Sequence, residues 1–221
     1  MTSLANTILP QPPPHDLLEH EIRTLAQHQR WAEAVSCALR GYGAEILGFL
    51  HAVVVDPTEA DDIFSALCEK IWRGLPGFRF ESTFRTWLYT VARNLAHDRG
   101  RARRWRNRWL AEAAGSGIFE VAARVRSTTA VHLRSGTKTH LRKILDMLPP
   151  EDRVLFVLRL DREMSWNEIA SVLTDDSDDE VDVVREASRL RKRFERVKAK
   201  VATQVRAIAG VGVHAPRPST E

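Results

Sequence analysis

The sequence has little that could cross-link it, hold a structural metal or cross a membrane. Its 221 residues include two cysteines, Cys37 and Cys68, too few for a disulfide framework or a four-thiolate zinc site. No run approaches the roughly 18 apolar residues that a membrane span needs, and residues 1–21 lack the basic and apolar regions of a signal peptide. We therefore expect a protein of a reducing compartment, the cytoplasm, without a membrane span.

Strand-like alternation, β-hairpin turns and internal repeats are also missing. Apolar residues recur at helical spacing instead, and a hydrophobic content of 43% suffices for packed cores. The sequence thus predicts an all-α fold. The segment Gly41-Tyr42-Gly43 lacks the third glycine and the preceding strand of a phosphate-binding loop. It predicts a break in a helix.

Signs of catalysis are weak. His97 and Asp98 resemble the metal pair of phosphohydrolases, but no complementary His and Asp cluster is identifiable from spacing. A tyrosine recombinase needs a Tyr nucleophile beside Arg and His. The only tyrosines are Tyr42 and Tyr89, and Tyr89 comes before Arg93 and His97 in one predicted helix, but residue 100 is glycine where an H-x-x-R pair would need arginine. We expect no enzymatic activity, no metal and no cofactor.

Charge is distributed unevenly along the chain. The net charge is only +4, from 33 basic and 29 acidic residues. Basic residues gather in 99–108 and 185–200, and acidic residues gather in 175–182. This segregation indicates a polyanionic partner more strongly than the net charge does.

The most informative segment runs from Phe78 to Arg106. Ser82 can cap a helix whose apolar stripe comprises Phe84, Trp87, Leu88, Val91, Ala92 and Leu95. Cations and amide donors lie on another face, namely Arg93, Asn94, His97, Arg101 and Arg104. Beyond it, further arginines are interleaved with Trp105 and Trp109. Guanidinium groups with interleaved indoles suit phosphates and unstacked bases, so this helix favours nucleic-acid binding over a merely solvated basic helix.

A second constellation lies near the C-terminus. Ser165 and Glu168 form a capping box that begins a short helix, and a long basic helix follows the acidic loop. This arrangement is typical of a helix-turn-helix. The alternative is a solvated helix with i,i+4 ion pairs, but Glu186 precedes Leu190 and Glu195 precedes Ala199 at that spacing. The pattern therefore favours DNA contact.

Both constellations resemble sigma factors of RNA polymerase of the extracytoplasmic-function type. The promoter-melting region of that family is matched by Phe78, Ser82, Phe84, Thr86, Trp87, Leu88, Ala92, Arg93, Asn94, Leu95, Ala96 and Asp98. Its C-terminal promoter-reading domain is matched by Leu145, Leu148, Pro149, Arg153, Val154, Leu158, Arg159, Ser165, Glu168, Ile169, Ala170 and Leu173, and its basic helix by 190–198. Two departures are Ser65 and Ala66, which replace a Gln and a Glu. A third is the acidic loop, which exceeds a tight turn.

Composition and helical patterning, together with this resemblance over about residues 40–108 and 140–200, predict five segments. They are a Pro-rich disordered tail (1–15), a helical domain for core polymerase and the minus-ten element (16–108), a linker with one short helix (109–139), a helix-turn-helix domain for the minus-thirty-five element (140–209), and a disordered tail (210–221). The resemblance also implies partners: the β and β′ subunits of core RNA polymerase, double- and single-stranded promoter DNA, and an anti-sigma factor.

The same resemblance implies three groups of contact residues. For core polymerase they are Asp61, Asp62, Ser65 and Glu69, on the outward face of a helix that Asp56 and Pro57 begin. For strand opening they are Phe80, Phe84, Arg93, Asn94, His97, Arg101 and Arg104. For the upstream duplex they are Arg185, Ser188, Arg189, Lys192 and Arg193. The alternative function is a helix-turn-helix regulator that binds DNA without polymerase, which would leave the helix after Ser82 unexplained.

Overall fold

The computed structural model describes residues 15–98, 117–133, 142–174 and 182–211, and within these ranges the protein is helical with no β-strand, as predicted. The helices are α1 (His15–Gln27), α2 (Trp31–Val53), α3 (Pro57–Gly74), α4 (Phe84–His97), α6 (Ile118–Leu133), α8 (Pro150–Leu160), α9 (Trp166–Leu173) and α10 (Val183–Val211), with a 3-10 turn η1 (Leu75–Gly77). A further helical turn spans 142–146. None of the helices in these ranges combines the length and apolarity needed to span a bilayer.

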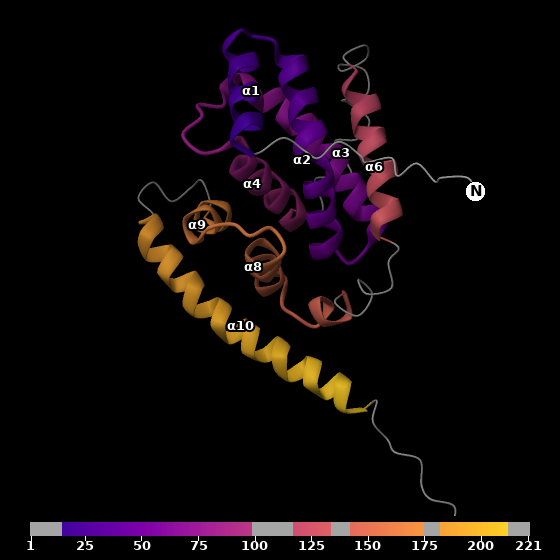
Figure 1. Ribbon diagram of the computed structural model, residues 1–221, viewed down its shortest axis with the longest axis vertical. Coiled ribbons are helices and arrows are strands. Elements are labelled where there is room, and N and C mark those ends of the chain that lie inside the picture. Colours follow the sequence, from indigo (N-terminus) through magenta and orange to yellow (C-terminus); the bar gives the residue numbers. More distant parts are fainter. Residues whose placement is uncertain (1–14, 99–116, 134–141, 175–181, 212–221) are drawn as a thin grey trace, which may run out of the picture.

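Helix α2 is the centre of the N-terminal half and packs against α1, α3, α4 and α6 (Figure 1). Large side chains such as Tyr42, Phe49 and Phe64 are fully buried around it. Helix α3 begins as the sequence predicts, because the Asp56 side chain accepts from Thr58 N at 2.8 Å and Pro57 occupies the first turn. The apolar stripe of α4 completes this core.

The predicted break at Gly41-Tyr42-Gly43 is wrong, because α2 runs without interruption through these residues. The glycines serve close packing instead. A Cβ at Gly41 would lie 2.1 Å from a methyl carbon of Leu18 on α1, and one at Gly43 would lie 2.9 Å from a methyl carbon of Val125 on α6. The missing side chains therefore let neighbouring helices approach α2 on two sides.

Helix α6 lies within the segment expected to be a linker. Its 16 residues pack along α2, with Ile118, Ala122 and Val125 buried. These residues thus belong to the folded body rather than to a free tether.

Helices α8, α9 and α10 form the C-terminal half, and they pack against the N-terminal half. Helix α8 contacts α2, α9 contacts α4, and the buried side chains of both halves form one continuous cluster. Helix α10 crosses α8 and α9 and extends past them along one edge of the molecule (Figure 1). One face of this helix is buried, with Ala187, Leu190, Phe194, Val197 and Val201, whereas Val184 and Val205, which share its apolar spacing, are exposed.

Candidate nucleic-acid interface

The first turn of α4 is held by two side chains. The N-cap is Thr83 and not Ser82 as predicted, since Thr83 Oγ1 accepts from Thr86 N at 3.1 Å. The Glu19 carboxylate on α1 accepts from the backbone N–H groups of Phe84 and Arg85 at 2.7 and 2.9 Å. Together these bonds satisfy three of the four amides that a helix N-terminus leaves without partners. The orientation of α4 is therefore fixed from α1.

An aromatic cluster joins the loop before α4 to its buried stripe. Phe78 stacks on Trp87 with ring centroids 4.8 Å apart, and Phe80 lies 4.6 Å from Phe78. Phe84 is fully buried beneath them, so it cannot meet a base in this conformation. Phe80 is partly exposed, has a φ of 57°, and lies under the guanidinium of Arg23. Of the two predicted aromatic contacts, Phe80 is the accessible one.

The predicted cationic face of α4 is only partly open. His97 is exposed, whereas the Arg93 side chain is 12% exposed. Arg93 donates to Asn94 Oδ1 at 3.0 Å and pairs with Glu151 of α8 at 3.8 Å. The structure therefore brings Arg93 and Asn94 together and turns Arg93 toward the second half of the molecule. Arg101 and Arg104 lie outside the described residues.

Beside this face is a polar cluster that sequence reasoning missed. Glu45 on α2 accepts from Arg85 Nε at 3.0 Å and from the Tyr89 hydroxyl at 2.8 Å. Burial, and then the Glu45 carboxylate, raises the pKa of Tyr89 well above its usual value. Arg85 Nη2 also donates to the Arg162 carbonyl at 2.8 Å. No local sequence signal could have found these partners, because they lie 40 residues or more from Arg85.

The face of α3 predicted to meet core polymerase is less open than expected. Glu69 is buried at 2% exposure and pairs with Arg73. Ser65 accepts a hydrogen bond from Arg126 of α6 at 2.8 Å. Asp61 pairs with His51 but keeps 49% of its side chain exposed, and Asp62 is partly exposed. The accessible part of this face is thus Asp61 and Asp62.

The capping box of α9 is confirmed, with Ser165 N donating to Glu168 and Glu168 N donating to Ser165 Oγ. Residues 174–182 separate α9 from α10, and the acidic residues 175–181 lie outside the described ranges. Asp182 accepts from the amides of Val184 and Arg185 at 3.1 Å, so the last acidic residue of the loop caps α10.

The predicted base-reading residues of α10 point in two directions. Arg185, Ser188, Arg189 and Lys192 are exposed. Arg189 nevertheless pairs with Glu186 at i,i+3 spacing. The sequence-based prediction considered i,i+4 pairs and therefore did not include this one. Arg193 is half-buried and donates to Asp152 of α8 at 2.7 Å. The first four therefore form an accessible cationic and hydroxyl face, and Arg193 joins two helices.

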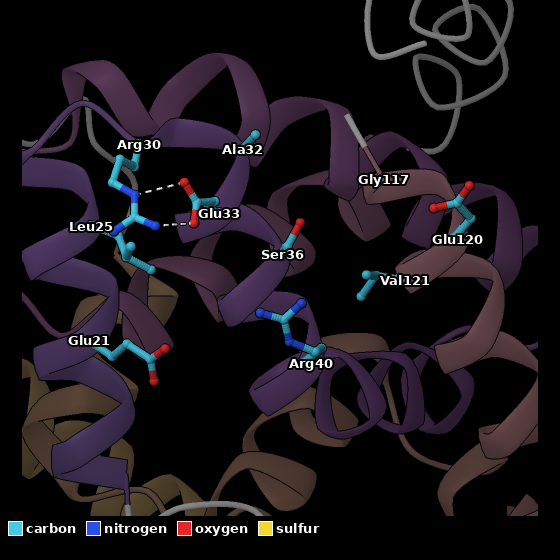
Figure 2. A pocket seen from close by; sticks show the side chains of 10 residues that line it. All are labelled: Glu21, Leu25, Arg30, Ala32, Glu33, Ser36, Arg40, Gly117, Glu120 and Val121. Carbon is cyan, nitrogen blue, oxygen red and sulfur yellow. Dashed lines mark hydrogen bonds and ion pairs between the residues drawn. The ribbon is translucent and has the colours of Figure 1, made fainter. Parts of the chain in front are cut away.

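A hollow lies elsewhere, among α1, α2 and the start of α6 (Figure 2). It measures ≈ 580 Å³ and is lined by both signs of charge: Glu21, Arg30, Glu33, Arg40 and Glu120. Arg30 and Glu33 bond to one another across its rim. None of the nucleic-acid candidates among the described residues lines it.

Comparison with known proteins agrees with this geometry. The family model of sigma-70 region 2 matches residues 38–106, which include part of α2 and all of α3 and α4. The RNA polymerase sigma-H factor of Pseudomonas aeruginosa is 31% identical over 137 residues, covering 60% of this chain and 70% of that protein. These matches place this all-α protein in the class of transcription initiation factors. This chain belongs to the RNA polymerase sigma factor family.

Proposed function

We propose that this protein binds core RNA polymerase, recognises promoter DNA and assists strand opening during transcription initiation, as a cytoplasmic factor of the extracytoplasmic-function type. The observation that carries the proposal is the coincidence of the region 2 match with α4. That helix buries one face in the core and carries Arg93, Asn94 and His97 on another.

Each half of the molecule has a separate role in this proposal. The accessible carboxylates of α3 contact the β′ or β subunit of the polymerase, and Phe80 with the polar face of α4 holds single-stranded bases. Arg185, Ser188, Arg189 and Lys192 on α10 enter the major groove of the upstream element. The protein supplies binding energy to the polymerase and no catalysis of its own. An anti-sigma factor is a further expected partner.

The experiment that tests the proposal is run-off transcription with purified core polymerase and a pool of genomic promoters. We expect promoter-specific transcripts only when the protein is added. A regulator that acts without polymerase would need only α8–α10, and it would protect duplex DNA by itself while leaving core enzyme unable to initiate. Specific footprints from the protein alone, without any core-dependent transcript, would therefore reject the proposal.

A further inference from the structure

The carboxylate of Glu19 on α1 accepts hydrogen bonds from two other helices. Its Oε2 accepts from Phe84 N and its Oε1 from Arg85 N, both in the first turn of α4. Oε1 also accepts from the Tyr42 hydroxyl of α2 at 2.8 Å. A carboxylate is favoured at this place, because the N-terminus of a helix carries partial positive charge. Glu19 thus fixes where α4 begins relative to α1 and α2.

Arg23 lies one turn further along α1 and holds the loop before α4. Its Nη2 donates to the Phe80 carbonyl at 3.3 Å, and its guanidinium carbon lies 5.1 Å from the centroid of the Phe80 ring. Phe80 has a φ of 57°, a left-handed conformation that aromatic residues rarely adopt. Such a conformation persists only where neighbouring groups hold it. Arg23 contacts both the backbone and the ring of Phe80, and it can therefore supply this support.

The two contacts hold the loop at two points along its length. Residues 81–83 lie between these points and are exposed. Because Phe80 and Phe84 are each attached to α1, the loop has a defined shape before a partner binds. A loop that is ordered in advance loses less conformational entropy on binding than a loop that orders on contact.

We propose that Glu19 and Arg23 are positioning residues for strand opening, which hold the segment from Phe80 to Phe84 in the shape that receives an unstacked base. They act through Phe80 and the first turn of α4. Helix α1 lies outside residues 38–106, which the region 2 model matches, so this role belongs to a part of the chain beyond that match. The inference rests on the proposed function, because it concerns the same Phe80 and α4 surface.

The sign of the effect at Glu19 separates positioning from simple electrostatics. DNA is a polyanion, so a purely electrostatic role would make Glu19→Gln bind DNA more readily than wild type. Positioning predicts the reverse, because glutamine has one acceptor oxygen where the carboxylate has two. Arg23→Ala does not make this separation, since loss of a cation weakens DNA binding by either route. Glu19→Gln is therefore the decisive variant.

The test uses full-length Glu19→Gln with Glu21→Gln as the matched control, the same substitution at an exposed position of the same helix. Thr83 still caps α4 in both variants, and circular dichroism checks that their helices are kept. Each protein is combined with core polymerase on a promoter that the run-off assay identifies. The promoter is supplied as a full duplex and as a premelted template, whose strands are mismatched over the opened region.

We expect Glu19→Gln to slow open-complex formation on the duplex by about tenfold, the scale of one hydrogen bond to a charged group. The appearance of permanganate-reactive thymines measures this rate. On the premelted template the variant should initiate as wild type does, because the strands are already apart. Its affinity for core polymerase should also be unchanged. Glu21→Gln should match wild type in every assay.

Arg23→Ala should show the same selective loss on the duplex promoter. Its control is Arg40→Ala, which removes an exposed arginine from α2. A loss with Arg23→Ala that is absent with Glu19→Gln would indicate a direct phosphate contact by Arg23, and it would overturn the joint positioning role.

Three results with Glu19→Gln would overturn the inference. The first is opening at the wild-type rate, and the second is faster opening, which electrostatic repulsion alone explains. The third is an equal loss on both templates together with weaker core binding, which marks a residue needed only for stability. In each of these cases, wild type that initiates with core polymerase still supports the proposed function. Wild type without any core-dependent transcript would overturn both the proposed function and the positioning role.

Discussion

Arg193 and Asp152 are joined by a 2.7 Å hydrogen bond that ties α10, the proposed recognition helix, to α8. The Asp152 side chain is largely buried, whereas Arg193 is half-exposed. Because Arg193 already serves as the partner of a buried carboxylate, we assign it the role of positioning α10, and we keep the base-reading role for its exposed neighbours.

The first prediction separates these roles by comparing Arg193→Ala with Arg189→Ala. Loss of Arg193 should cost about 1–3 kcal/mol of unfolding free energy, because Asp152 is left buried without this partner. Arg189 is mostly exposed, and its one ion pair among the described residues is with Glu186, so its loss should cost at most about 1 kcal/mol. Urea unfolding measures both effects.

DNA binding by the same two variants should distinguish base recognition from helix positioning. Arg189→Ala should relax preference at one promoter position, whereas Arg193→Ala should weaken all duplexes alike. A loss of base preference in Arg193→Ala without loss of stability would contradict the positioning role.

Local sequence patterns predicted most helices of this fold. They did not predict the contacts between residues that lie far apart in the sequence. The stripe of α4 and the cap at Asp56 were readable, because each depends on residues within a few turns. Glu19 and Glu45 were not, since they meet α4 from distant helices. The glycines of α2 were misread because sequence alone cannot distinguish a helix break from close approach of a neighbouring helix.

The sequence indicated which residues make up the candidate site, but it did not indicate which of them are exposed to solvent. Arg93 and Asn94 lie close enough to hydrogen-bond, yet nothing in their spacing indicates that Arg93 pairs with Glu151 of α8 and is largely buried. Glu69 follows the periodicity of an outward position, but α3 buries it beside Arg73. Exposure depends on how helices pack, and packing of the two halves has no local signature.

The second prediction concerns the capping box of α9. Ser165→Ala should destabilise the protein by about 1 kcal/mol, because it removes the acceptor for Glu168 N from a helix of only eight residues. Ser171→Ala on the same helix is the control, since its exposed hydroxyl bonds only to the Asn167 carbonyl one turn earlier. Equal unfolding midpoints for the two variants would argue against the cap as a source of stability.

The third prediction tests the polymerase contact. Charge reversal at Asp61 and Asp62 should lower affinity for core polymerase by about tenfold or more, a loss of about 1.4 kcal/mol, if these are the accessible contacts of α3. Helicity should be unchanged, because Asp61 is about half exposed. The matched control is reversal of Glu59 in the first turn of α3, and pull-down titration with core enzyme is the measurement. Unchanged affinity in the double variant would remove this face from the proposed interface.

The fourth prediction concerns pH and the buried thiol of Cys68. Burial raises the pKa of this group from 9.0 to about 12. The unfolded chain therefore loses the proton first as pH rises, so the stabilisation is complete below about pH 9 and is lost between pH 9 and 12. Between pH 8 and 10.5 wild type should lose about 2 kcal/mol more than Cys68→Ala, at about 1.36 kcal/mol for each pH unit above the unfolded pKa. Parallel stability curves for the two proteins would contradict a protonated buried thiol.

The last prediction concerns Gly43, where α6 approaches α2. Alanine favours a helix by about 1 kcal/mol over glycine, but a Cβ here would lie 2.9 and 3.2 Å from the two methyl carbons of Val125. Valine is stiff at χ1, so it cannot turn aside easily. We expect Gly43→Ala to destabilise the protein by about 1–3 kcal/mol, as overpacking does. In a Val125→Ala background the same substitution should become neutral or stabilising, because the clash is gone.

Gly77→Ala is the control, since no described atom lies within 4 Å of its Cβ position. Thermal unfolding of the four proteins of this double-mutant cycle measures the coupling, and additive effects would show that α6 does not depend on the missing side chain at position 43.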